Sequence, residues 1–260
     1  MAAGVAIWTG ACGSHSGPSA PEVPAPTSGL PSGGPCSVLS GAGTAIQNGT
    51  ACDATTASVV LMNLRDSDNA PSAACSATVI APRAVLTAAH CLVGHTASVQ
   101  IYPGTLPQIS ASSFHAYPGY SEDDPNALDV GVVLFDHDIG RTPVPLFLSR
   151  DAQVGETAIV AGWGNDQHNN ADVLRAGPTT ISAVGPALLQ TQFGTNVAAV
   201  CPGDSGGPLL LDAGGVWAIA GITSAVTNTA CIEGTDFFAN VRNPAIAAFI
   251  LGLVPEAARR

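Results

Sequence analysis

The chain has 260 residues and a formal net charge of −11, with 19 acidic residues, eight arginines and no lysine. A nucleic-acid-binding protein needs a basic patch, so this charge argues against a nucleic-acid partner. The length suits one large all-β domain or two small ones. Only 10% of the residues are charged, and 29 glycines and 20 prolines predict short strands joined by many turns. Beyond the N-terminal segment, no apolar run is long enough to span a bilayer.

Residues 1–35 are predicted to be a targeting segment followed by a flexible linker. Small residues before Cys12 resemble the end of a bacterial lipoprotein signal, although Thr9 and the lack of a basic region depart from that pattern. Ser, Pro and Gly then dominate as far as Pro35, which is typical of a solvated tether. We expect an extracytoplasmic protein, secreted or anchored to the bacterial cell envelope through a lipid on Cys12. The alternative is that Cys12 is an ordinary free cysteine.

Short apolar runs after residue 56 are separated by turns rich in Gly, Pro or Asp, and they fall into two sets. The first set is 57–64, 75–80, 84–89, 97–102 and 130–135. The second set is 157–161, 179–184, 197–200, 208–211, 216–222 and 237–241. Two such sets predict an all-β fold of two six-stranded antiparallel β-barrels with a cleft between them. Residues 244–254 predict a closing helix, since Pro244 suits a first helical position.

A serine lies between glycines in Gly203–Pro208, directly after an acidic residue. Glycines permit tight turns and leave open space around the Ser205 hydroxyl. A serine hydroxyl is a weak nucleophile that needs a base, and the base needs a third group to orient it. The best candidates are His90, after the apolar run 84–86, and Asp129, at the start of another. A buried acid needs a hydrogen-bond donor, which an imidazole N–H supplies.

Three motifs, Thr-Ala-Ala-His-Cys, Asp-Val-Gly-Val-Val-Leu and Gly-Asp-Ser-Gly-Gly-Pro, occur in this order. In sequence and order they resemble the chymotrypsin/trypsin-like serine proteases. The resemblance runs from about Ile46 to the C-terminal segment. It implies a serine endopeptidase with a catalytic triad of His90, Asp129 and Ser205. It also implies an oxyanion hole formed by the amides of Gly203 and Ser205, and a supporting hydrogen bond from Ser224 to the triad acid.

Seven cysteines favour an oxidising compartment. The resemblance implies disulfides Cys75–Cys91 and Cys201–Cys231. Cys12, Cys36 and Cys52 are then left, and we expect Cys36 to pair with Cys52, with Cys12 as the odd one out.

The resemblance also implies an activation step. Residues 36–45 are predicted to be a short propeptide, with the protease domain spanning 46–260. A cut before Ile46 would free an amino group that pairs with Asp204, because a buried carboxylate needs a partner. Such a cut implies an activating protease as a partner. The alternative is that Asn48-Gly49 marks a plain surface turn.

Substrate preference is left open by the residues expected at the substrate pocket. The resemblance assigns Ala199, Ser224, Val226 and Asp236 to it. Ala199 replaces the acid of trypsin, and Val226 narrows the pocket, which favours small aliphatic side chains before the cut bond. A carboxylate at Asp236 instead favours arginine or lysine. Both preferences therefore stay open.

The expected partners are protein or peptide substrates, without a cofactor or metal. The acidic residues 122–124 lack dedicated metal-ligand spacing and are expected to form a solvated loop. Two other functions compete with the endopeptidase. One is a non-catalytic binding protein that keeps the fold, and the other is an esterase-like hydrolase, whose usual strand–helix elbow is absent around Ser205.

Overall fold

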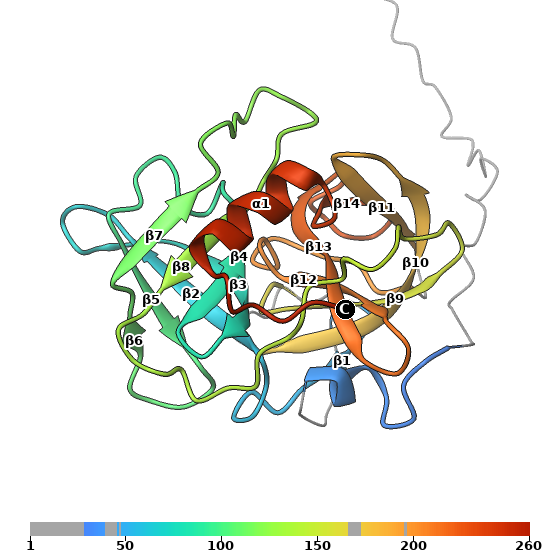
Figure 1. Cartoon of the computed structure of the whole chain (residues 1–260), viewed down its shortest axis with the longest axis horizontal. Coiled ribbons are helices and arrows are strands. Elements are labelled where there is room, and N and C mark those ends of the chain that lie inside the picture. Colours follow the sequence, from blue (N-terminus) through green and yellow to red (C-terminus); the bar gives the residue numbers. More distant parts are fainter. Residues whose placement is uncertain (1–28, 40–45, 47, 166–172, 195–196) are drawn as a thin grey trace, which may run out of the picture.

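A computed structural model describes residues 29–39, 46, 48–165, 173–194 and 197–260 of the chain. Its fold is mostly β, with a closed six-stranded barrel, a half-barrel and one short C-terminal helix (Figure 1). The all-β prediction with two antiparallel units is thereby confirmed. Cys12 and most of the predicted targeting segment and linker, residues 1–28, lie outside the described residues.

The first unit is a seven-stranded antiparallel sheet in the order β6-β5-β2-β3-β4-β8-β7, on the left of Figure 1. Its strands are β2 (Val59–Arg65), β3 (Pro71–Ala81), β4 (Ala84–Thr87), β5 (Ser98–Tyr102), β6 (Ile109–Ser110), β7 (Ser113–Ala116) and β8 (Gly131–Leu134). Within the described residues, its end strands β6 and β7 do not pair, so it curls without closing.

The second unit closes into a barrel because β9 pairs with both β12 and β10. Its strands are β9 (Thr157–Gly162), β10 (Arg175–Val184), β11 (Leu188–Phe193), β12 (Pro208–Asp212), β13 (Trp217–Val226) and β14 (Gly234–Asn240). The two-residue β1 (Thr50–Ala51) pairs with the start of β10. Most expected runs are strands of this unit, with slightly different bounds.

Two differences from the expected strands have physical reasons. All four residues of 197–200 are buried, so their apolar sequence resembles that of a buried strand. In the structure they form a loop that leads into Cys201. The strand β11 was not predicted, because its polar residues Gln190, Thr191 and Gln192 dilute the apolar signal. Its burial nevertheless alternates for most of its length, as expected for a barrel strand with one inward face.

Residues 35–39 pack against the β-sheet units. A 3₁₀ helix, η1 (Pro35–Leu39), buries Cys36 and Leu39, and Leu39 is fully buried. The amide of Ser58 donates to the Leu39 carbonyl at 3.2 Å. The disulfide Cys36–Cys52 ties the same segment down. A cut before Ile46 therefore leaves the predicted propeptide attached.

The structure contains the other two expected disulfides as well. Cys75–Cys91 joins β3 to the loop after β4, and Cys201–Cys231 joins the two loops on either side of β12 and β13. Each bridge reduces the freedom of the unfolded chain, which stabilises the folded state.

The C-terminal helix α1 (Pro244–Leu253) packs on the first unit after the chain has completed the second (Figure 1). Ile246 and Ile250 enter the larger hydrophobic core, and Phe249 lies edge-on to Tyr117 with ring centroids 5.6 Å apart. The helix thus ties the end of the chain back to the half-barrel. No helix in the described part of the chain is long and apolar enough to cross a membrane.

We predict that Asn243→Ala destabilises the protein by about 1 kcal/mol, because Asn243 is the N-cap of α1. Its Oδ1 accepts from the amides of Ala245 at 2.9 Å and Ile246 at 3.4 Å, and its Nδ2 donates to the Pro186 carbonyl. Urea unfolding of both proteins measures the difference. The matched variant Asn243→Asp keeps the capping oxygen and should retain most of the stability. Equal losses in the two variants would contradict the capping role.

Candidate active site

The pairing of β4 with β8 brings His90 and Asp129 together. Thr87, the last residue of β4, lies opposite Gly131, the first residue of β8. His90 follows the one strand and Asp129 precedes the other, so antiparallel pairing places both at the same edge. The His90 Nδ1 atom lies 2.7 Å from Asp129 Oδ2, and the His90 amide donates to Oδ1 at 2.9 Å.

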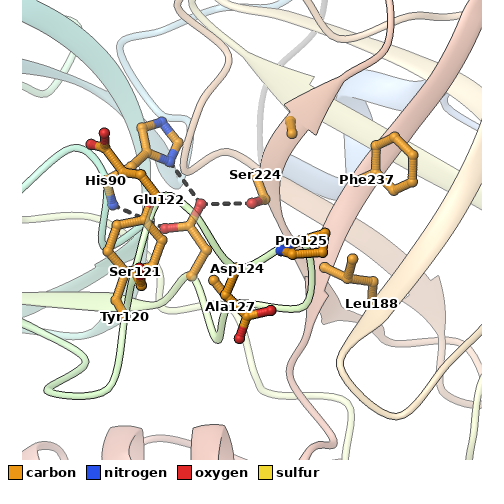
Figure 2. Close-up of a pocket in the computed structure, with 12 residues that line it drawn as sticks. His90, Tyr120, Ser121, Glu122, Asp124, Pro125, Ala127, Leu188, Ser224 and Phe237 are labelled. Carbon is orange, nitrogen blue, oxygen red and sulfur yellow. Dashed lines mark hydrogen bonds and ion pairs between the residues drawn. The ribbon is translucent and has the colours of Figure 1, made fainter.

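The Asp129 carboxylate also receives a hydrogen bond from the second unit. Ser224, on β13, donates its hydroxyl to Oδ2 at 2.6 Å. Figure 2 shows His90 and Ser224 reaching this carboxylate from different elements. Asp129 is 1% exposed, and a buried carboxylate is costly unless such donors satisfy it. The side chain of His90 is 25% exposed, so its ring faces the cleft.

The turn around Ser205 needs its glycines. Gly203 has φ +99° and Gly206 has φ +80°, which other residues rarely adopt. A Cβ on Gly206 would lie 2.1 Å from the Thr87 hydroxyl oxygen, and one on Gly203 would lie 2.8 Å from the Gly164 Cα. The glycines therefore let this turn pack directly against both units.

The turn is held by hydrogen bonds from both units. From β3, the Ser76 amide donates to the Ser205 carbonyl at 2.8 Å, and the Ser76 hydroxyl donates to the Gly203 carbonyl at 3.0 Å. From β13, the Thr223 carbonyl accepts from the Gly206 amide at 2.8 Å. Sequence reasoning missed Ser76. It lies in an ordinary strand run, and only the tertiary structure brings it to Ser205.

The Gly203 and Ser205 amides differ from those of their neighbours. The amides of Asp204, Gly206 and Gly207 donate within the protein, whereas those of Gly203 and Ser205 donate to no group among the described residues. They are therefore available to a bound oxygen, as an oxyanion hole requires. Between described residues, the Ser205 hydroxyl makes no hydrogen bond to the His90 ring. Such contacts are often loose without substrate.

Two cavities meet at Ser224 and Ala225. One, of about 290 Å³, lies beside Ser205. Its wall consists of Val200, Cys201, Pro202, Ser205, Thr223, Ser224, Ala225, Val226 and Thr229. The other, of about 330 Å³, holds His90, Asp129 and Tyr120 (Figure 2). Burial and the nearby Asp129 and Glu122 charges raise the pKa of Tyr120 to about 12.

Two residues expected at the substrate pocket lie behind its wall. Ala199 is 1% exposed and Asp236 is fully buried, and neither lines the cavity beside Ser205. The Asp236 Oδ2 accepts from the Thr191 hydroxyl at 3.1 Å, whereas Oδ1 has no partner among the described residues. Burial raises the pKa of Asp236 to about 8, and the nearby Asp204 charge adds to this. Asp236 is therefore mostly uncharged at neutral pH, which does not support recognition of basic side chains.

The residues expected to take part in activation lie in buried positions. Ile46 is 1% exposed and packs in the core of the second unit with Ala198 and Val200. The Asp204 carboxylate is also buried, and it accepts from the Gly164 amide at 2.7 Å and the Cys201 amide at 2.8 Å.

One cluster in the described residues has the composition of a metal site. Ligand atoms of Cys75, His90 and Cys91 lie within 4.8 Å of one another. Both sulfurs are joined in the Cys75–Cys91 disulfide, so they cannot act as thiolate ligands. The cluster therefore restrains the His90 loop and does not fit a metal ion.

Known proteases are similar to this chain in sequence. Transmembrane protease serine 9 of Rattus norvegicus is 30% identical over 184 residues, covering 58% of this chain and 17% of that protein. The trypsin of Saccharopolyspora erythraea is 26% identical over 161 residues, covering 53% and 70%. The chain spans only 41% of transmembrane protease serine 11C of Mus musculus, so much of these longer relatives lies outside the match.

A solved structure of HL collagenase has the same fold. It matches with a TM-score of 0.68 and covers 81% of this chain and 99% of the collagenase chain, at 19% identity. A family model described as Trypsin matches residues 46–248, which include His90, Asp129 and Ser205. Because that match extends over well more than half of the chain, the protein belongs to the trypsin family.

Proposed function

We propose that the protein is a serine endopeptidase that cleaves peptide bonds through an acyl-enzyme intermediate, with His90, Asp129 and Ser205 as its triad. The observation that carries the proposal is the Asp129 carboxylate, which holds His90 at 2.7 Å and Ser224 at 2.6 Å beside the Ser205 turn. No cofactor is needed for this chemistry. Its expected partners are protein or peptide substrates.

The chemical steps follow from the geometry. Ser205 Oγ attacks the substrate carbonyl carbon, and its proton passes to His90 Nε2. Asp129 accepts from Nδ1, which fixes the ring and stabilises the imidazolium. The unpaired amides of Gly203 and Ser205 stabilise the oxyanion. His90 then gives the proton to the leaving amine. Water, activated by His90 in the same way, attacks the acyl carbon and releases Ser205.

The cavity beside Ser205 favours small aliphatic side chains at the P1 position, before the cut bond. Val226 lines this cavity. Asp236 does not line it, because it is fully buried, and it is mostly uncharged at neutral pH. A valine in the wall reduces the depth available to a side chain, and an uncharged carboxyl gives little attraction to a guanidinium. Of the two preferences left open by the sequence, the small one is proposed.

The place of action is proposed to be outside the cytoplasm. Three disulfides suit an oxidising compartment, and trypsin-family proteins that contain them are typically extracellular. Lipid attachment at Cys12 and cleavage before Ile46 by an activating protease stay predictions.

Ser205→Ala is expected to lower the kcat for a peptide substrate by about 10⁴-fold or more, since it removes the nucleophile. Asp129→Asn should lower it by about 10⁴-fold, because the amide favours the wrong imidazole tautomer. Hydrolysis of a fluorogenic peptide library, with intact folding checked by circular dichroism, measures both. Folded variants that keep wild-type turnover would overturn the proposed triad. A folded wild-type protein inactive both before and after cleavage ahead of Ile46 would favour the non-catalytic binding protein.

Val226→Gly is expected to shift the P1 preference from alanine toward phenylalanine by about 10-fold or more in relative kcat/KM, because the wall of the pocket recedes. Kinetics over a series of peptides that differ only at P1 measure the shift. Val216→Gly makes the same chemical change away from the Ser205 cavity and should leave the preference unchanged. A preference for arginine that Asp236→Ala abolishes would contradict the proposed small pocket.

Asp236→Asn is expected to stabilise the protein more above pH 8 than at pH 4, by up to about 5 kcal/mol, because each pKa unit corresponds to about 1.4 kcal/mol. Burial raises the Asp236 pKa in the folded state from 3.8 to about 8. The unfolded state therefore loses the proton first, and the stability contributed by the protonated form falls between about pH 4 and pH 8. Urea unfolding across this range, in a Ser205→Ala background that prevents self-digestion, measures the effect. A pH-independent difference between Asp and Asn would contradict the raised pKa.

A further inference from the structure

We propose that Arg175 is a positioning residue whose guanidinium serves as the internal counter-charge of Asp204, so that the uncut chain already holds the Ser205 turn in its working shape. The inference rests on the proposed endopeptidase function. It differs from the cleavage expected before Ile46, because the positive charge comes from the body of the protein and not from a new N-terminus.

The pairing of β9 with β10 places the Arg175 side chain on the face of the sheet that the Asp204 carboxylate contacts. Arg175 lies directly opposite Gly162, and directly opposed residues of an antiparallel pair project from the same face of the sheet. A Cβ on Gly162 would lie 2.2 Å from Asp204 Oδ1, so the face that Arg175 shares is the one that the Asp204 carboxylate touches. Arg175, on β10, and the Asp204 carboxylate, from the loop before β12, therefore lie on the same face of the β9–β10 pair.

Gly164 connects the two side chains. The Arg175 Nη1 atom donates to the Gly164 carbonyl at 2.8 Å, and the Gly164 amide donates to Asp204 Oδ1 at 2.7 Å. A Cβ on Gly164 would lie 2.6 Å from Asp204 Oδ2, so only glycine admits the carboxylate this closely. One peptide segment is thus bound by the guanidinium through its carbonyl and by the carboxylate through its amide.

Arg175 is unusual in its burial. It is 4% exposed and Asp204 is 1% exposed, and no other arginine among the described residues is buried. A buried cation is costly unless an anion and hydrogen bonds compensate it. Burial raises the pKa of Asp204 to about 6, whereas the amides of Cys201 and Gly164 and the charge of Arg175 lower it. Arg175 therefore favours the ionised carboxylate.

The ionised carboxylate shapes the turn that carries Ser205. Asp204 Oδ2 accepts from the Cys201 amide at 2.8 Å, and the Asp204 amide donates to the Cys201 carbonyl at 2.9 Å. The Asp204 carbonyl accepts from the Gly207 amide at 2.8 Å. These bonds bracket Gly203 and Ser205, so a fixed Asp204 fixes the direction of both free amides. The proposed oxyanion hole thereby depends on the partner of Asp204.

The test compares labelling rates of Ser205 by a fluorophosphonate in uncut and cut full-length chains. Residues 41–45 are replaced by Asp-Asp-Asp-Asp-Lys, so that enteropeptidase cuts before Ile46 on demand. Arg175→Gln removes the internal charge, Arg175→Lys keeps it, and Arg83→Gln is a matched control at an exposed arginine. Thermal unfolding of each variant reports its stability.

The inference predicts that the uncut chain is labelled and that cutting changes its rate by less than about threefold. Uncut Arg175→Gln should lose about 10- to 100-fold in labelling rate, because Asp204 is left without its buried partner. Arg175→Lys should retain most of the rate, and Arg83→Gln all of it. Cutting Arg175→Gln should restore labelling, since the freed amino group of Ile46 supplies a positive charge. If Arg175 were needed only for folding, cutting the Arg175→Gln variant would not restore its labelling.

Two results would overturn the inference while leaving the proposed function intact. One is an uncut chain that is not labelled until it is cut, and the other is uncut Arg175→Gln labelled as fast as the uncut wild type. Absence of labelling in every form, cut or uncut, would instead overturn the proposed function itself.

Discussion

The candidate site depends on the hydrogen bonds that the buried Asp129 carboxylate accepts. Its hydrogen bonds come from His90, at the edge of the half-barrel, and from Ser224, on a strand of the closed barrel. A carboxylate this deeply buried is tolerated only where donors surround it, so the two units must meet in one arrangement. Ser76 adds a second link, because it binds the Ser205 turn from the half-barrel. The proposed catalytic geometry is therefore a property of the interface between units.

A second buried acid, Asp204, makes hydrogen bonds across the turn that carries Ser205. Backbone amides and the neighbouring Arg175 favour its charge, while burial opposes it. The third, Asp236, is fully buried, and its Oδ1 has no partner among the described residues, so burial suppresses its charge. Three buried carboxyl groups thus have different environments within one fold. Asp129 accepts hydrogen bonds from His90 and Ser224, Asp204 accepts from backbone amides around the Ser205 turn, and Asp236 stays mostly uncharged.

Short motifs predicted which side chains meet at the candidate site better than they predicted the residues around it. His90, Asp129 and Ser205 each lie in a short motif that predicts the proposed triad role. Gly203 and Gly206 predict the tight turn. Strands with strong apolar runs, such as β4 and β12, were also predictable. β11 was not, because its buried face includes the polar Thr191, which breaks the alternation of apolar and polar residues. Residues 197–200 were predicted as a strand because they are apolar, but they are buried in a loop. Ser76, Arg175 and the buried state of Asp236 depend on contacts between distant segments, which no local pattern encodes.

The central claim is that Ser205 is a nucleophile activated by His90 within this frame. Intact-mass measurement of the full-length protein after reaction with a fluorophosphonate, followed by peptide mapping, tests it most directly. The account predicts one adduct per chain, located on Ser205, and its loss in the His90→Ala variant. A folded protein that forms no adduct in either the uncut or the cut form, or forms it on a different residue, would contradict the account.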